Sequence, residues 1–319
     1  MTISKALGLG LVRGGVAAFV LAVSTHGWAF CRTYTCNPKN ETCPLIDGCI
    51  VGGKPLQWAS STVSWDVQQD DSSKPGLTAA ALELATSDAF ARWVNVDCPG
   101  GGKPSIRLLN RGPIACGVPE YNQTTSNANV VAYHDAPWPY RLTGSELLAQ
   151  ETLYFNPNTG EIYDANLEIN TDQYDFAVAG AVSPVLDLNA VLTHQVGHFL
   201  GLSHSRLPEA TMYQDYDPGM VTLDADDIAA ICEAYPPGRI AASDSDEPRH
   251  GFSGECADAQ GDAGAAGAAG AASDSGGKSS GCSVRGVAGA SPFGGAALML
   301  GVCVVVVRRR RRRASEAAL

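Results

Sequence analysis

Positive charge is scarce in this chain of 319 residues. Its 22 lysines and arginines stand against 33 acidic residues, which gives a formal net charge of -11 at pH 7. Six of the arginines are consecutive, at residues 308–313, so the rest of the chain is more acidic still. This balance argues against a nucleic-acid partner and suits a soluble exported protein.

Histidine is also scarce, but half of it is concentrated in one place. Of the six histidines, His194, His198 and His204 fall within residues 194–204. The first two are four residues apart, so on a helix they lie on one face and can bind the same metal ion. Gly201 stands where a helix often ends in a left-handed residue, and a sharp turn there brings in His204 as a third ligand. Three neutral imidazoles with one open position are typical of catalytic zinc rather than structural zinc.

This stretch resembles the long zinc signature of the metzincins, H-E-x-x-H-x-x-G-x-x-H. The sequence Ala-Thr-Met-Tyr at residues 210–213 is similar to the Met-turn. Together with His204-Ser205, these residues are most similar to the matrixin branch of the metzincins. The resemblance implies zinc on the three histidines, with Met212 beneath the metal and Gly201 at the turn. It also implies an α+β fold of the metzincin or zincin-like type, with a twisted mixed sheet, an active-site helix and a small C-terminal lobe.

One position departs from this signature and bears directly on catalysis. The family has glutamate after the first histidine, whereas this chain has Gln195. In the family, that glutamate takes a proton from the attacking water and passes it to the departing amine. An amide cannot accept that proton near neutral pH, and general acid–base help is typically worth about 10²–10⁴-fold in rate. Glu209 is the nearest other carboxylate in sequence, and nothing in the sequence places it beside the metal.

Two main classes of function follow from the motif. The resemblance implies an exported, surface-tethered zinc metalloendopeptidase whose hydrolysis is impaired by Gln195. The alternative is a zinc-binding pseudoprotease that holds peptides without cutting them, as a peptide-binding or adhesive surface protein. A third reading, a disulfide-stapled structural protein without metal, requires the histidine spacing to be a coincidence. We expect an extended peptide or protein partner, Zn²⁺ as cofactor and a monomeric chain.

Cysteine is abundant for a reducing compartment. Eight of the ten cysteines lie from Cys31 to Cys256, an even number compatible with four disulfides in an oxidising space. The first four crowd into residues 31–49, which predicts a small disulfide-stapled loop; a metal knuckle is the alternative, but no histidine accompanies these thiols. Residues 116–120, Cys-Gly-Val-Pro-Glu, resemble the matrixin cysteine switch, although a disulfide between Cys116 and Cys98 is the plainer expectation. Cys256 is expected to pair with the N-terminal loop.

The ends of the chain carry export and anchoring signals. Residues 1–29 resemble a secretory signal peptide, with an uncleaved membrane anchor as the alternative. A Gly/Ala/Ser-rich linker is predicted at 241–281. Residues 282–319 combine Cys282, an apolar run long enough to cross a bilayer and the arginine tail. They resemble the C-terminal sorting signal of myxobacterial surface proteins, and a single-pass membrane anchor is the alternative. Both interpretations predict that the domain is exported and is either held at the cell surface or secreted.

Between these ends we expect a cysteine-rich disulfide segment at 30–57 and a matrixin-like domain at 58–240. Asp187 is expected to cap the active-site helix, and a final helix is expected at 223–232. The other predicted elements are strands at 62–67, 105–109 and 129–134, a helix at 77–96, and a hairpin of 151–155 with 161–169. In the matrixins the edge strand near 150–155 binds extended substrate by strand addition.

A second metal is a weaker expectation. Asp164, Glu168 and Asp172 offer oxygen ligands suited to calcium. A solvated polar face is the alternative for these three acids. His134 is the only spare histidine in this region, so the structural zinc of many matrixins has no evident ligand set.

Overall fold

The fold is built on one mixed β-sheet. The computed structural model describes residues 29–38, 41–140, 147–178, 185–256 and 298–301. In these residues a seven-stranded sheet has the order β13-β8-β9-β7-β5-β6, with β4 paired to β9. Strands β5, β6, β7 and β9 are mutually parallel, and β8 runs antiparallel to β9. The strands are β4 (Gln57–Trp58), β5 (Thr62–Gln68), β6 (Arg107–Ile114), β7 (Val130–Tyr133), β8 (Ala149–Phe155), β9 (Glu161–Ile169) and β13 (Leu298–Gly301).

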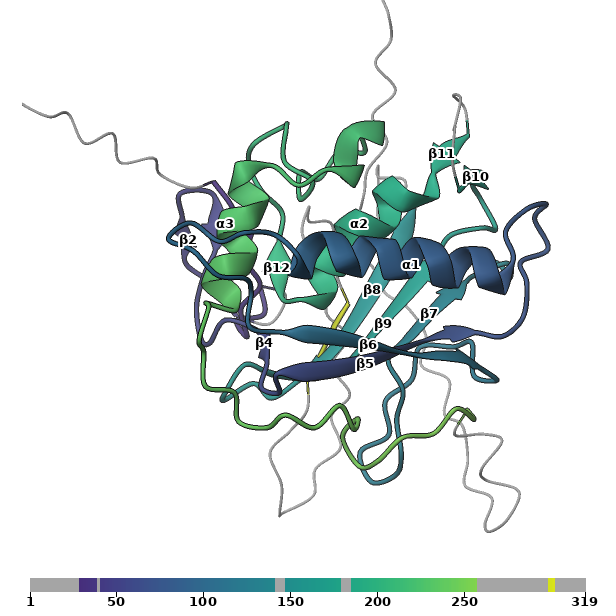
Figure 1. Ribbon diagram of the computed structural model, residues 1–319, viewed down its shortest axis with the longest axis horizontal. Coiled ribbons are helices and arrows are strands. Elements are labelled where there is room, and N and C mark those ends of the chain that lie inside the picture. The colour runs from purple at the N-terminus through teal and green to yellow at the C-terminus, as the bar shows by residue number, and fades with distance from the viewer. Residues whose placement is uncertain (1–28, 39–40, 141–146, 179–184, 257–297, 302–319) are drawn as a thin grey trace, which may run out of the picture.

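The helices cover one face of this sheet (Figure 1). Helix α1 (Ala79–Val94) and helix α2 (Leu188–Phe199) pack against each other above the strands, and α3 (Ala225–Ala234) lies in a smaller lobe. Short elements complete this lobe and the loops: β1 (Cys31–Arg32), β2 (Leu45–Ile46), β3 (Cys49–Ile50), β10 (Phe176–Ala177), β11 (Leu186–Asp187), β12 (Leu202–Ser203) and the 3₁₀ helix η1 (Pro218–Val221). The predicted metzincin-like α+β fold, with a mixed sheet, an active-site helix and a small C-terminal lobe, is confirmed.

Local sequence accounts for α1. Thr78 caps its first turn, since its hydroxyl accepts from the backbone N–H of Ala81 at 3.1 Å. Its inner stripe, which includes Leu82, Phe90 and Trp93, is buried in the main core together with α2. Burying such side chains is worth about 1.5–3 kcal/mol each, so packing rather than helix propensity holds α1 in place.

The predicted strands and hairpin are present, with shifted ends. The strand expected at 105–109 becomes β6, which runs from Arg107 to Ile114, because its parallel partner β5 extends the pairing over seven residues. Strands β8 and β9 form the expected hairpin, closed by the turn in which the N–H of Gly160 donates to the carbonyl of Asn156 at 2.8 Å. The outer edge of β8 is paired over residues 152–155 with β13.

The far face of the sheet is covered by residues 241–256, the start of the predicted linker. This C-terminal extension crosses beneath the strands, opposite the helices (Figure 1). The N–H of Ser61 donates to the carbonyl of Ser243 at 2.8 Å, and the hydroxyl of Ser64 donates to the carbonyl of Asp246 at 2.8 Å. The folded unit therefore continues past residue 240 and reaches Cys256.

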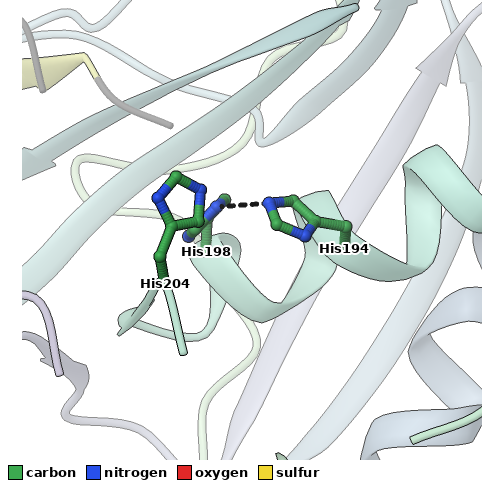
Figure 2. Close-up of side chains that lie close together, drawn as sticks. All are labelled: His194, His198 and His204. Atoms are coloured by element: carbon green, nitrogen blue, oxygen red, sulfur yellow. Dashed lines mark hydrogen bonds between the residues drawn. The ribbon is translucent and has the colours of Figure 1, made fainter. Parts of the chain in front are cut away.

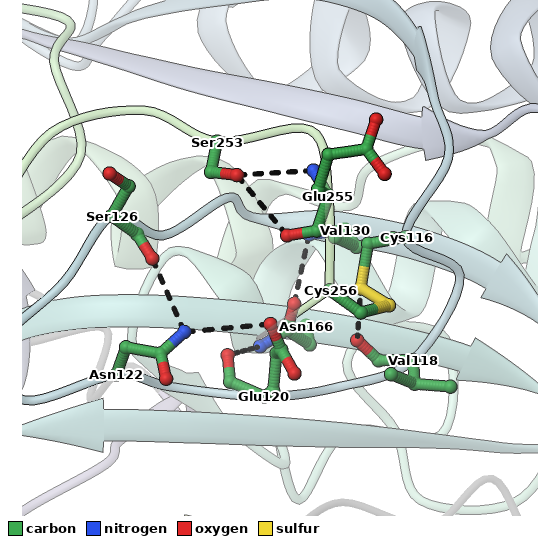
Figure 3. The surroundings of a disulfide bond; sticks show 10 residues. All are labelled: Cys116, Val118, Glu120, Asn122, Ser126, Val130, Asn166, Ser253, Glu255 and Cys256. Carbon is green, nitrogen blue, oxygen red and sulfur yellow. Dashed lines mark hydrogen bonds between the residues drawn. A yellow bond between two sulfur atoms is a disulfide. The ribbon is translucent and has the colours of Figure 1, made fainter. Parts of the chain in front are cut away.

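The disulfide pairing differs from the expected one. Cys98 bonds Cys232 in α3, and Cys116 bonds Cys256 at the end of the C-terminal extension (Figure 3). The expected Cys98–Cys116 bond is therefore wrong, as is a partner for Cys256 in the N-terminal loop. Because the Cys116 thiol is consumed by the disulfide, it is not a cysteine switch. The N-terminal cysteines do form the predicted stapled loop, through Cys31–Cys49 and Cys36–Cys43.

The termini lie mostly outside the described residues. Of the predicted signal peptide only Ala29 is described, and Cys282 with most of the C-terminal apolar run is not. Residues 298–301 of that run form strand β13. None of the helices in the described part of the chain combines the length and apolar character needed to span a bilayer.

Asp66 is a buried charge on the far face of β5. It is 0% exposed, and neither carboxylate oxygen has a hydrogen-bond partner. Burial raises the pKa of Asp66 from 3.8 to about 7, although the nearby Arg111 guanidinium opposes the rise. The carboxyl group of Asp66 thus binds its proton more tightly in the folded chain than in the unfolded chain. The stability contributed by Asp66 is full below about pH 4 and is lost as the pH rises to about 7.

We predict that Asp66→Asn raises the free energy of unfolding at pH 8 by about 1–3 kcal/mol and changes it little at pH 4. Urea denaturation of both proteins at the two pH values measures this. The exposed Asp70 provides a matched control, and Asp70→Asn should change the free energy by less than about 0.5 kcal/mol at either pH. Destabilisation by Asp66→Asn at pH 8 would contradict the prediction.

Candidate metal centre

Helix α2 is fixed at its start and along its length. As predicted, Asp187 is its N-cap, and the side chain accepts from the N–H groups of Asn189 and Ala190 at 2.8 and 3.3 Å. In the middle of the helix, the indole N–H of Trp93 donates to the carbonyl of Thr193 at 2.7 Å. This contact from α1 holds the turn that begins the histidine motif.

The helix ends as the motif predicts. Gly201 has a φ of +83°, in the left-handed region that glycine adopts at little cost in free energy. A Cβ at this position would lie 2.4 Å from the carbonyl oxygen of Leu56, so the close approach of the backbone also requires glycine. The chain reverses here into β12, and this reversal brings His204 back towards α2.

The three imidazoles converge on one point (Figure 2). Their ring centroids are 4.7 Å apart for His194 and His198, 5.3 Å for His194 and His204, and 5.1 Å for His198 and His204. One nitrogen from each ring lies within 4.8 Å of the other two. Nε2 of His204 is buried and has no hydrogen-bond partner. Among the described residues, this group of three side chains could hold a metal ion.

The tautomers of two rings follow from their backbone partners. Nδ1 of His194 is 2.7 Å from the carbonyl of Thr211, and Nδ1 of His198 is 2.8 Å from the carbonyl of Leu202. Because a carbonyl only accepts, each Nδ1 carries the proton, and each neutral ring presents a bare Nε2. These two Nε2 atoms are 3.0 Å apart, so two lone pairs face each other. A metal ion held by both nitrogens would replace this repulsion with coordination.

Burial keeps the rings neutral. It lowers the pKa of His194 from 6.5 to about 4 and, with His194 nearby, the pKa of His204 to about 3. The pKa of His198 is lowered well below 6.5 by burial and by the two neighbouring rings. Neutral imidazole is the form that binds a metal, so the site needs no proton loss at pH 7.

Met212 lies under the motif and is completely buried. A Cβ on Gly197 would stand 2.2 Å from its sulfur, so glycine is what allows α2 to lie on the Met-turn. Asp227 in α3 holds this turn, since its carboxylate accepts from the N–H groups of Thr211 and Met212 at 2.7 and 3.0 Å. Sequence reasoning missed this role, because an acid in the first turn of a helix is already explained by the helix dipole.

The position of the general base is occupied by an amide inside the core. Gln195 is 0% exposed on α2, directly after the first histidine. Glu209 is exposed on the loop before the Met-turn, and it makes none of the hydrogen bonds that hold the histidines. The described metal-capable group at this site contains histidines alone.

The acids proposed for calcium are separately engaged. Asp164 accepts from Asn166, Glu168 accepts from His134 at 2.8 Å, and Asp172 accepts from the N–H of Trp138 at 3.0 Å. Asp164 and Glu168 are four residues apart on β9, which corresponds to roughly 13 Å. The structure therefore does not bring them to one ion, and the remaining metal-capable groups in the described residues contain disulfide-bonded cysteines.

Comparison with known proteins places this geometry in a class. Residues 133–236 match the sequence profile of the family described as Matrixin. Metalloendoproteinase 1-MMP of Arabidopsis thaliana is 35% identical over 85 residues, which is 26% of this chain and 23% of that protein. Karilysin of Tannerella forsythia is 32% identical over 182 residues, 56% of this chain and 33% of that protein. The chain thus spans a third or less of the length of these curated relatives.

The fold and the histidine site define a metzincin-like domain. The matched segment contains α2, all three histidines and the Met-turn, and it makes this domain matrixin-like.

We predict that His204→Ala weakens Zn²⁺ affinity by more than roughly 100-fold. Loss of an outer-sphere partner costs roughly 10–100-fold, and this change removes one of the three ligands themselves. Competition against a chromophoric chelator measures the affinity. His134→Ala is the matched control, since His134 bonds Glu168 and is no part of the histidine group. The control should stay within about twofold of the unmodified chain. Equal losses in the two variants would contradict the site.

Proposed function

We propose that this chain is a zinc metalloendopeptidase-type domain that binds extended peptides and whose hydrolysis is limited by Gln195. One observation carries the proposal: three neutral imidazoles, two of them buried and the third partly buried, bring their nitrogens close to a common position. Two lone pairs that face each other repel, so the geometry of the described residues fits a cation between them. His194, His198 and His204 would hold it.

Zinc, when bound, polarises a substrate carbonyl and lowers the pKa of a water molecule. The chain's own residues supply the positioning. The carbonyls of Thr211 and Leu202 orient two rings, and the buried Met-turn fixes the floor of the site. Gln195 places a buried amide directly after the first histidine, and an amide is no titratable proton acceptor. Proton transfer to the leaving amine is therefore the step that this chain does not support.

Strand β8 supports a peptide as the ligand. Its outer edge accepts a strand in antiparallel register, since Leu298 pairs with Phe155 and Gly301 with Thr152. Addition of a strand to an open edge gives affinity through main-chain hydrogen bonds that any sequence offers. An extended peptide in the same register would take the place of β13 beside a strand that packs on α2.

Gln195 also favours the second candidate, a pseudoprotease that binds peptides without cutting them. The two candidates share the zinc site and differ only in turnover. Four disulfides among the described residues support an oxidising, extracytoplasmic location for either one. We propose that residues 1–29 direct export and that residues 282–319 direct sorting or anchoring at the surface.

We predict that Gln195→Glu raises peptide hydrolysis by the zinc-loaded full-length chain by about 10²–10⁴-fold, because it restores a general base. Cleavage of a mixed peptide library, followed by mass spectrometry, measures the rates and the preferred sites. Gln69→Glu makes the same chemical change at an exposed position and serves as the control, with no expected gain.

Each result distinguishes the candidates. Cleavage by the Gln195→Glu variant alone identifies a peptidase cleft whose natural chain binds peptides. Similar rates for both proteins would mean that another group supplies the base, and that the interpretation of Gln195 is wrong. Absence of cleavage by either protein would remove the peptidase assignment.

A further inference from the structure

The backbone that follows α2 is enclosed by the cysteine-rich N-terminal segment. Strand β1 pairs antiparallel with β12, so Cys31 lies opposite Ser203 and Arg32 opposite Leu202. The N–H of Thr33 donates to the carbonyl of Gly201 at 3.0 Å. These contacts hold the residues between the left-handed turn at Gly201 and the third histidine.

One carbonyl is shared between this segment and a metal-site histidine. The carbonyl oxygen of Leu202 accepts from Nδ1 of His198 at 2.8 Å and from the hydroxyl of Thr33 at 3.1 Å. A carbonyl that accepts two hydrogen bonds is fixed in direction by both donors. Thr33 thus acts on the orientation of His198 through Leu202, although it is more than 160 residues away in the sequence.

The same N-terminal segment also contacts the residues that pack against the turn at Gly201. The guanidinium of Arg32, only 7% exposed, donates to the carbonyl of Leu56 at 2.7 Å, and the N–H of Leu56 donates to the carbonyl of Thr33 at 2.7 Å. That Leu56 carbonyl is the group against which Gly201 packs. The path of the chain towards His204 is therefore set by Arg32, Thr33 and Leu56 together.

The two disulfides of this segment are placed differently. Cys31–Cys49 joins β1, the strand that contacts β12, to β3. Cys36–Cys43 closes a separate small loop, and neither of its cysteines belongs to the β1–β12 pairing. Both bonds restrict the unfolded chain, but Cys31–Cys49 alone ties down the strand beside the metal site.

We propose that the N-terminal segment, residues 29–38 and 41–56, is a positioning element of the zinc site, held by Cys31–Cys49 and acting through Thr33 and Leu202. This inference rests on the proposed zinc binding and adds to it. The histidine motif contributes the ligands, and a separate part of the chain fixes where two of them point. A disulfide at the N-terminus thereby sets metal affinity at a helix that begins at residue 188.

The test compares two double variants and two single variants of the full-length chain. Cys31→Ser with Cys49→Ser should raise the zinc dissociation constant at least about tenfold, which is the cost of disturbing an outer-sphere partner. Cys36→Ser with Cys43→Ser, the matched control, should leave it within about twofold. Chelator competition measures the affinity. The visible spectrum of the Co²⁺-loaded chain reports ligand geometry, which general destabilisation alone does not alter.

The single variants keep the test valid if a disulfide variant fails to fold. Thr33→Val deletes the hydroxyl that bonds Leu202 and should weaken zinc binding about fivefold, the worth of a typical hydrogen bond. Thr35→Val deletes a hydroxyl that accepts from Lys54 at 3.0 Å inside the same segment, and it should have no effect on zinc. Equal zinc affinity and Co²⁺ spectra for Thr33→Val and Thr35→Val would overturn the positioning role. An unmodified chain that takes up no zinc would overturn the proposed function itself.

Discussion

The structure depends on two hydrogen bonds from imidazole Nδ1 atoms to backbone carbonyls. They fix the protons of His194 and His198 on the outer side of each ring and leave two bare nitrogens 3.0 Å apart in a buried space. Facing lone pairs in low dielectric are unfavourable unless a cation lies between them. Much of the surrounding architecture supplies the carbonyls: Thr211 belongs to the Met-turn held by Asp227, and Leu202 belongs to the strand held by β1.

Sequence reasoning reached those features that local chemistry encodes. The cap at Asp187, the glycine that ends α2, the convergence of the histidines and the β8–β9 hairpin all follow from patterns that are local in the sequence, and each is present. The long-range pairings were missed. Cys98 and Cys116 are close in sequence and invite pairing with each other, but their partners stand 134 and 140 residues away. The sequence of the C-terminal extension does not indicate that it packs on a face of the sheet, because its apolar residues are not regularly spaced.

Gln195 separates two properties that usually occur together in such sites. The metal-binding geometry needs only neutral imidazoles and fixed carbonyls, and the side chains that converge on the site include no carboxylate. Proton transfer needs a titratable group, and the described site has none besides the histidines. The contacts that orient the histidines and the group that would transfer a proton are therefore different atoms, and a change at residue 195 can alter one without the other.

The Cys116–Cys256 bond has a mechanical consequence. Cys256 is the last residue of the C-terminal extension, so tension that reaches this extension from the residues directly after it enters the fold through this bond. The force passes to the end of β6 and then, by shear along parallel hydrogen bonds, into β5. Helix α3 and the Met-turn lie off this line, since they precede residue 241 in the chain and pack in the other lobe. Tension that arrives through Cys256 would therefore stretch the sheet before it disturbed the histidines.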